Sequence, residues 1–374
     1  MIPPHIRAAF QMLAVGQASA CPYDVDWNAL LAFTDRFQLT LYLRHVDGLP
    51  AHIQDQIQLR RAKNLSKRGR LRTAYYEVAE ILTTAGIEFL LLKGFTHQNV
   101  FGISPEDRVQ YDLDILCRPE DRESATRALF EAGYRSHGER SLSAEHSRPL
   151  VKPSEWKWRG DYFDPDVPIS IELHDSLWHP AHDRILVDMP QVWRHKTVLK
   201  INCLTIPALS EIDRIRFASL HVLRHVLRND ARPAHAFELA CVSIPPQNPD
   251  LLELCGFRFA AAWFGSPVVL PGLPPKIDAW FNQFAWSPIE NLITPNKDAI
   301  WLHLMLLEKW YDRAAVLRRR LTPFRLPHQH AGFFERLGYH AAALARALLS
   351  GFRWRRSYTT STASQISAWN RPRV

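Results

Sequence analysis

Residues 111–117 read Tyr-Asp-Leu-Asp-Ile-Leu-Cys and place two carboxylates, Asp112 and Asp114, inside a run with the composition of a β-strand. Side chains alternate across a strand with period two, so the two carboxylates point to one face while Leu113 and Ile115 turn to a core. Two close carboxylates raise each other's pKa unless positive charge neutralises them. A hard divalent cation with oxygen ligands does this well, so the run predicts a sheet with a metal-binding face.

A second alternating run, Ile-Ser-Ile-Glu-Leu-His at residues 169–174, predicts another strand. If this strand lies beside the first, Glu172 adds a third carboxylate to the same face, with His174 two residues further along. Three carboxylates can hold two Mg²⁺ ions, and ions about 4 Å apart clamp the attacking and leaving oxygens of an in-line phosphoryl or nucleotidyl displacement. Charge on the solvent-facing side of a half-buried sheet is the plainer alternative.

Short motifs stand in order along residues 80–180. They are Leu91-Leu92-Lys93-Gly94, then Arg108, then Asp112-Leu113-Asp114-Ile115-Leu116, then a helical segment ending Gly133-Tyr134, and finally Ile171-Glu172-Leu173-His174. Together they resemble the uncharacterised nucleotidyltransferase family of the polymerase-β-like superfamily. The stretch from His221 to His225 and the helical residues after it resemble the C-terminal half of that family more weakly.

The resemblance implies a small mixed sheet, a glycine turn beside a triphosphate, and metal binding by an Asp-x-Asp pair with a third carboxylate. On this chain it implies Asp112, Asp114 and Glu172 as catalytic metal ligands, with two Mg²⁺ or Mn²⁺ ions expected. It also implies Lys93 and the Gly94 backbone at the phosphates of an NTP such as ATP, which is the expected donor substrate.

Other residues near these motifs are candidates with open alternatives. Phe95 stands where the wider superfamily usually has Gly or Ser, which makes Thr96 the nearest hydroxyl for a nucleotide contact. Arg108 suits a nucleotide contact and a salt bridge to a site carboxylate equally well. Lys93 has the alternative of a surface lysine at a strand end. His174 is expected beside the metal ligands or on the acceptor side.

The chain has 374 residues, of which 47% are hydrophobic, enough for two or three packed units. We expect an N-terminal helical region at 1–80, the nucleotidyltransferase core at 81–185, a helical C-terminal region at 186–356 and a flexible tail, rich in Ser and Thr, at 357–374. The expected fold class is therefore α+β, with a polymerase-β-like core of small mixed sheet flanked by helical regions.

Local patterns predict several elements in more detail. Apolar spacing and capping residues predict helices over 62–82, 118–132 and 210–227. Alternation over 155–163 predicts a strand that forms a hairpin with the 169–174 run.

His221 and His225 stand four residues apart in the 210–227 segment and therefore share one face of the expected helix. That spacing suits zinc, but the chain has no His-Glu-x-x-His motif. Packing, or a polar contact to the substrate, is the preferred interpretation of this pair.

Charge and composition limit the partners. The formal net charge of +8 favours acidic partners such as nucleotides or RNA, although it is also ordinary for solubility. The arginine-rich clusters at 318–320 and 353–356 are a weaker indication of nucleic-acid binding, which is not favoured. No run supplies the about 20 uninterrupted apolar residues of a membrane span. Five scattered cysteines without a Cys-x-x-Cys pair favour reduced thiols and a cytoplasmic location.

The expected reaction moves a nucleoside monophosphate from an NTP to a hydroxyl or similar acceptor and releases pyrophosphate. The sequence does not identify the acceptor, which could be a small molecule, a peptide, a protein or an RNA. Two alternatives stay open: kinase-like transfer of the γ-phosphate at the same site, and a noncatalytic interaction protein that keeps the fold. The intact set of carboxylates argues against the second.

Overall fold

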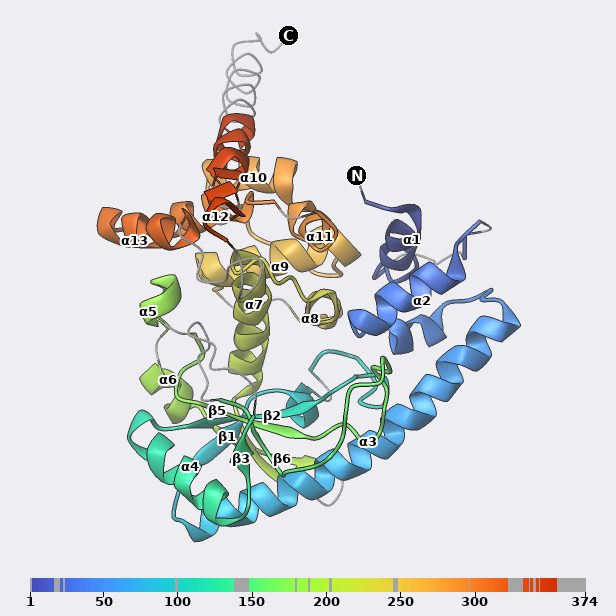
Figure 1. Cartoon of the computed structure of the whole chain (residues 1–374), viewed down its shortest axis with the longest axis vertical. Coiled ribbons are helices and arrows are strands. Elements are labelled where there is room, and N and C mark those ends of the chain that lie inside the picture. The colour runs from blue at the N-terminus through green and yellow to red at the C-terminus, as the bar shows by residue number, and fades with distance from the viewer. Residues whose placement is uncertain are drawn as a thin grey trace.

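The computed structural model describes residues 2–16, 21–22, 24–97, 100–137, 148–178, 180–187, 189–201, 204–244, 248–294, 296–321, 332–335, 337–338, 341–342 and 344–354. The tail 357–374, which was expected to be flexible, lies outside these residues, as do Cys203, Arg355 and Arg356. Figure 1 shows a sheet with helices on both of its faces and a large group of helices beyond one face.

Within the described residues, seven strands form one mixed sheet in the order β3-β4-β5-β2-β1-β7-β6. The strands are β1 (Phe89–Leu91), β2 (Asp112–Cys117), β3 (Arg135–Ser136), β4 (Leu150–Val151), β5 (Ser170–His174), β6 (Thr197–Ile201) and β7 (Leu204–Ala208). The pairs β2–β5 and β1–β7 are parallel, and the remaining neighbours are antiparallel. The expected α+β class is confirmed.

Helices precede, connect and follow the strands. Those before the sheet are α1 (Pro4–Met12), α2 (Trp27–Arg36), the 3₁₀ helix η1 (Thr40–His45) and α3 (Ala51–Thr84). Those between strands are η2 (Gly94–His97), η3 (Pro119–Asp121), α4 (Arg122–Glu131), α5 (Pro180–Asp183) and α6 (Met189–Arg194). Those after it are α7 (Glu211–Leu227), α8 (Pro233–Ala240), α9 (Leu251–Phe264), α10 (Pro275–Phe284), α11 (Ser287–Asn291), α12 (Ala299–Leu306) and α13 (Trp310–Leu321).

One face of the sheet is apolar and packs on α3 and α4 (Figure 1). Leu113 and Ile115 of β2 and Ile171 and Leu173 of β5 are fully buried there, together with Tyr75 of α3. Burying one such aliphatic side chain contributes roughly 1.5–3 kcal/mol. Because strand side chains alternate, this core dictates that the polar residues between them face the opposite side.

The opposite face looks toward α7, which rises from the sheet into the C-terminal helices (Figure 1). Phe217 of α7 packs with Leu92 and Leu116 in a small buried cluster on this side. Helices α8 to α12 join α1 and α2 in the largest core. The long helix α3 contributes to both hydrophobic cores. Ile53 lies in the largest core, and Leu71 lies in the core under the sheet.

Most of the expected local elements are present. Helix α3 includes residues 62–82, α4 ends just before Gly133 at φ +92°, and the Ser210 side chain caps α7 by accepting from Asp213 N. The β6–β7 hairpin was not anticipated, because the region after 186 was expected to be helical.

The strand expected over 155–163 is wrong. Residues 157–160 are exposed, so their alternation does not mark one buried and one solvated face. Asp164 instead accepts hydrogen bonds from the Trp156 indole and the Arg159 guanidinium, both at 3.0 Å. The antiparallel neighbour of β5 is β4, which precedes this segment.

Among the helices that the structure describes, none combines the length and apolar content needed to cross a bilayer. The described cysteines, Cys21, Cys117, Cys241 and Cys255, are free thiols, as their scattered spacing predicted.

Helices α7 and α9 approach each other closely at Gly256. A Cβ atom on Gly256 would lie 2.1 Å from the backbone oxygen of Ser219 in α7. We expect Gly256→Ala to lower the free energy of unfolding by about 1–3 kcal/mol, because the added methyl forces the two helices apart. Urea denaturation measures this change.

The matched control is Gly69→Ala in the exposed part of α3, where an added Cβ would meet nothing within 4 Å. There the same substitution is expected to stabilise by about 0.4–1 kcal/mol, because it restricts the unfolded chain. A Gly256→Ala protein as stable as the wild type would contradict the close crossing.

Candidate active site

Parallel pairing of β2 with β5 builds the acidic face of the sheet. Asp112 lies opposite Ser170, and Asp114 lies opposite Glu172. Paired positions of neighbouring strands share a face, so the three carboxylates and His174 project away from the core under the sheet. The strand at 169–174 therefore does lie beside the Asp-x-Asp strand, which the sequence alone could not establish.

Asp114 is the centre of this group. Its Oδ1 lies 2.8 Å from Lys93 Nζ and 3.0 Å from His174 Nε2. Burial alone would raise the pKa of Asp114, but the Lys93 charge and the His174 contact hold it well below its usual range. The second oxygen, Oδ2, is buried and has no hydrogen-bond partner among the described residues.

The carboxylates also control the protonation of Lys93. Burial alone would lower its pKa, yet the negative charges of Asp114, Asp112 and Glu172 outweigh burial and raise it. Lys93 therefore stays an ammonium group. Burial and the nearby Asp114 charge raise the pKa of Asp112, although Lys93 and Arg108 act in the opposite direction.

Asp114, Glu172 and His174 offer ligand atoms that all lie within 4.8 Å of one another. Two carboxylates and an imidazole suit a divalent cation, and the buried, unpartnered Asp114 Oδ2 is a ready ligand atom. This group of ligand atoms differs in one member from the three expected metal ligands, Asp112, Asp114 and Glu172. His174 stands within it, whereas Asp112 lies half-buried at the start of β2.

The turn after β1 depends on a glycine. Gly94 has φ +71°, and a Cβ there would lie 2.1 Å from the Gln110 side chain. Gln110 Nε2 in turn donates to Asp112 O at 2.7 Å. The Thr96 hydroxyl is buried and donates to Leu92 O at 3.2 Å, so it is engaged within the turn.

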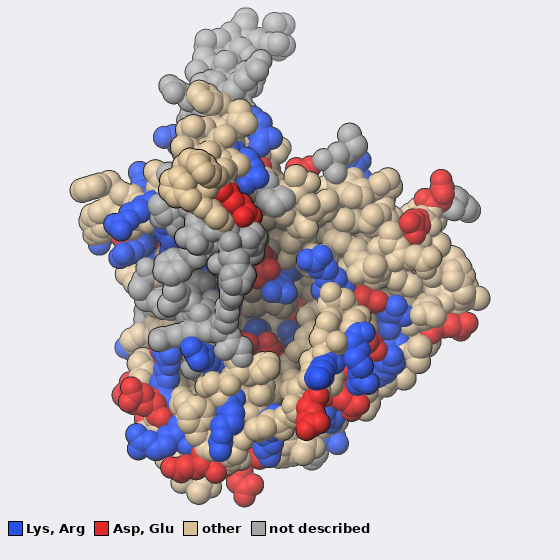
Figure 2. Space-filling model, in the orientation of Figure 1, with Lys and Arg blue, Asp and Glu red and all other residues tan. Residues whose placement is uncertain are grey.

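A small pocket adjoins this turn. Its lining includes Gly94 and Gln110 together with Arg68, Arg108 and His97. Figure 2 shows the molecule hollowed between the part that holds the sheet and the C-terminal helices, with acidic and basic side chains inside the hollow. The pocket therefore combines a glycine turn, against which the Gln110 side chain packs, with positive charge.

Glu238 of α8 organises the far side of the pocket. Its carboxylate lies 2.9 Å from Arg108 Nε and 2.9 Å from His97 Nδ1, and it accepts from the Tyr42 hydroxyl at 3.1 Å. Burial alone would raise the pKa of Glu238, but the Arg108 charge and the His97 hydrogen bond lower it strongly. Arg108 is thus paired with Glu238 and not with one of the three predicted carboxylates.

Sequence reasoning missed Glu238 and Gln110. Glu238 stands in Ala-Phe-Glu-Leu-Ala, an apolar helical segment without a motif. The one available signal was the single acidic residue within that apolar segment. Such a carboxylate is expected to be buried, and a buried carboxylate requires a partner.

Comparison with known families agrees with the geometry. The sheet with its carboxylate face has the form expected of a nucleotidyltransferase core. The family described as Uncharacterised nucleotidyltransferase matches residues 23–245, which is more than half of the chain. The chain belongs to this family, and the resemblance inferred from the motifs is confirmed. No curated protein and no solved structure gives a significant match.

Replacing Glu238 by Gln tests the buried ion pair. We expect a loss of about 3–5 kcal/mol in the free energy of unfolding at pH 7, because the substitution leaves the Arg108 charge buried without a counter-charge. Since folding lowers the pKa of Glu238, its stabilisation is complete above the ordinary value of 4.5 and is lost as the pH falls. The gap between wild type and variant should therefore narrow from pH 7 to pH 3.

Chemical denaturation at the two pH values measures this gap. Glu131→Gln, at an exposed position at the end of α4, is the matched control. It should leave the free energy of unfolding unchanged at both pH values. Equal stability of Glu238→Gln and wild type at pH 7 would contradict the assigned role.

Proposed function

We propose that this protein transfers a nucleoside monophosphate from an NTP to an acceptor hydroxyl or similar nucleophile and releases pyrophosphate. The observation that carries the proposal is the acidic face at Asp112, Asp114 and Glu172, placed beside Lys93 and the left-handed turn at Gly94. Membership in a nucleotidyltransferase family supports this class of reaction.

Asp112, Asp114 and Glu172 would hold divalent ions, Mg²⁺ or Mn²⁺, and we propose two of them. Carboxylate oxygens are the ligands that such ions prefer, and the unpartnered Asp114 Oδ2 supports this assignment. When bound, the ions stabilise charge on the transferring phosphoryl group and acidify the attacking hydroxyl. His174 contacts Asp114 and orients it.

Other side chains would bind the polyphosphate. Lys93 is positioned to neutralise charge that develops on the leaving phosphates. Gly94 lacks a Cβ, which lets its backbone approach a phosphate closely. Arg68 and Arg108 line the same pocket and add positive charge, with Arg108 shared between the nucleotide and Glu238. We assign the Thr96 hydroxyl to support of the turn.

Glu172 faces the acceptor in this scheme. Its side chain is 18% exposed, whereas that of Asp114 is fully buried. A nucleophile arriving from solvent would therefore reach Glu172 before Asp114. We further propose that the C-terminal region at 186–356 closes over the core at 81–185, to whose sheet it adds β6 and β7. The N-terminal region at 1–80 packs against both, through α1 and α2 on the C-terminal helices and α3 under the sheet. The acceptor could be a small molecule, a peptide, a protein or an RNA.

Nucleotide binding provides the first test. Thermal unfolding is followed with each NTP, with and without Mg²⁺, for the wild type, Asp112→Asn and Glu172→Gln. We expect at least one NTP to stabilise the wild type only when Mg²⁺ is present, by about 2.7 kcal/mol at a hundredfold excess over Kd. Both variants should lose this stabilisation because each removes a charged ligand.

Glu131→Gln is again the matched control, because it removes the same charge on the opposite side of the sheet and should keep the response. The NTP that binds is then used in an acceptor screen read by mass spectrometry. An added nucleoside monophosphate supports the proposal, whereas an added phosphate alone would indicate kinase-like transfer. A folded wild type that responds to no NTP would favour a noncatalytic interaction protein.

A further inference from the structure

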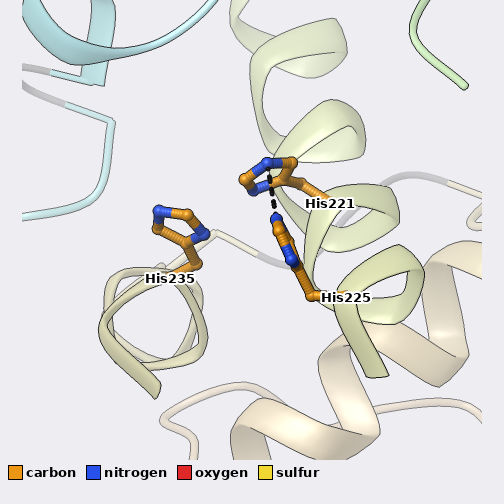
Figure 3. Close-up of side chains that lie close together, drawn as sticks. All are labelled: His221, His225 and His235. Carbon is orange, nitrogen blue, oxygen red and sulfur yellow. Dashed lines mark hydrogen bonds between the residues drawn. The ribbon is translucent and has the colours of Figure 1, made fainter. Parts of the chain in front are cut away.

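Three histidines meet between α7 and α8 (Figure 3). His221 and His225 lie one turn apart on α7, and His235 approaches them from α8. The Nε2 atoms of His221 and His225 are 3.1 Å apart, and the three residues offer ligand atoms within 4.8 Å of one another. Two nitrogens on a tetrahedral zinc ion are about 3.4 Å apart, so the α7 pair already has chelating spacing.

His235 brings an independent indication. Its Nδ1 is buried and has no hydrogen-bond partner in the part of the chain that the structure describes. Figure 3 shows a ring nitrogen of His235 turned toward His221 and His225. A buried polar nitrogen without a partner costs free energy that a metal ligand bond would recover.

A carboxylate contacts the second ring nitrogen of His225, as is common for histidines that bind metal. Its Nδ1 lies 3.4 Å from the Asp230 carboxylate, just beyond the end of α7. A histidine that binds metal commonly donates its other ring N–H to a carboxylate. Such a contact directs the Nε2 lone pair of His225 toward His221.

A negative charge stands beside the three imidazoles. The Asp230 carboxylate, 3.4 Å from His225 Nδ1, would offset part of the charge that a bound cation adds.

We propose that His221, His225 and His235 bind one divalent transition-metal ion of the zinc class and leave a fourth position for water or another ligand. Imidazole suits zinc, copper and nickel, while Mg²⁺ prefers oxygen, so this site is chemically distinct from the carboxylate face. The ion would tie α7 to α8. The sequence favoured packing or a polar contact to the substrate because the chain has no His-Glu-x-x-His motif, whereas the structure brings a third histidine from another helix.

Zinc titration of the full-length, metal-free protein by calorimetry tests the site, and Co²⁺ absorption reports its coordination geometry. We expect zinc binding by the triad in the wild type, in His52→Gln, an exposed histidine of α3 that serves as matched control, and in Glu172→Gln. Binding should weaken by at least about tenfold in His225→Gln and His235→Gln, and by about 10- to 100-fold in Asp230→Asn.

Thermal unfolding without metal shows whether each variant is folded. If His225→Gln does not fold, the result for His235→Gln decides the test. A folded His235→Gln protein that has lost the zinc response supports the proposal. The proposal is overturned if the wild type binds no zinc, or if folded His235→Gln binds as tightly as His52→Gln. Zinc binding that is lost in Glu172→Gln and kept in His235→Gln would also overturn it, by placing the ion on the carboxylate face.

Discussion

Parallel pairing of β2 with β5 sets Asp114 beside Glu172, and the opposite face of the sheet fixes that register. A slip of one residue would turn Glu172 into the core under the sheet and expose Ile171 on the acidic face. The aliphatic side chains that pack on α3 and α4 exclude this slip, because they are fully buried. Hydrophobic packing on one side of the sheet therefore determines where carboxylates stand on the other.

A buried ion pair and a buried hydrogen bond hold the segment that follows β1. Lys93 is paired with Asp114 on the sheet, and His97, at the end of η2, contacts Glu238 on α8. The turn at Gly94 lies between these anchors. Arg108 pairs with the same Glu238, so the connection leading to β2 is held from the same point. A single carboxylate from the C-terminal helices thus shapes the pocket beside the sheet.

Much of the fold could be predicted where its causes are local. Alternation marked β2 and β5, and the Ser210 cap and Gly133 marked helix ends, because these signals act within a few residues. The β6–β7 hairpin was missed, and a strand at 155–163 was wrongly expected, because burial against distant segments decides such cases. The same limit hid Glu238, since its partners lie more than a hundred residues away and no motif marks it.

Helix α7 carries residues that contact two different parts of the molecule. Near its start, the Arg214 guanidinium donates to Thr96 O at 2.5 Å and holds the turn after β1. Further along, the same helix carries His221 and His225. Seventeen residues of helix form a rod about 25 Å long that resists stretching and compression. The contact at Thr96 and the imidazoles therefore rest on one continuous helix, which fixes the spacing between Arg214 and the two histidines along its axis.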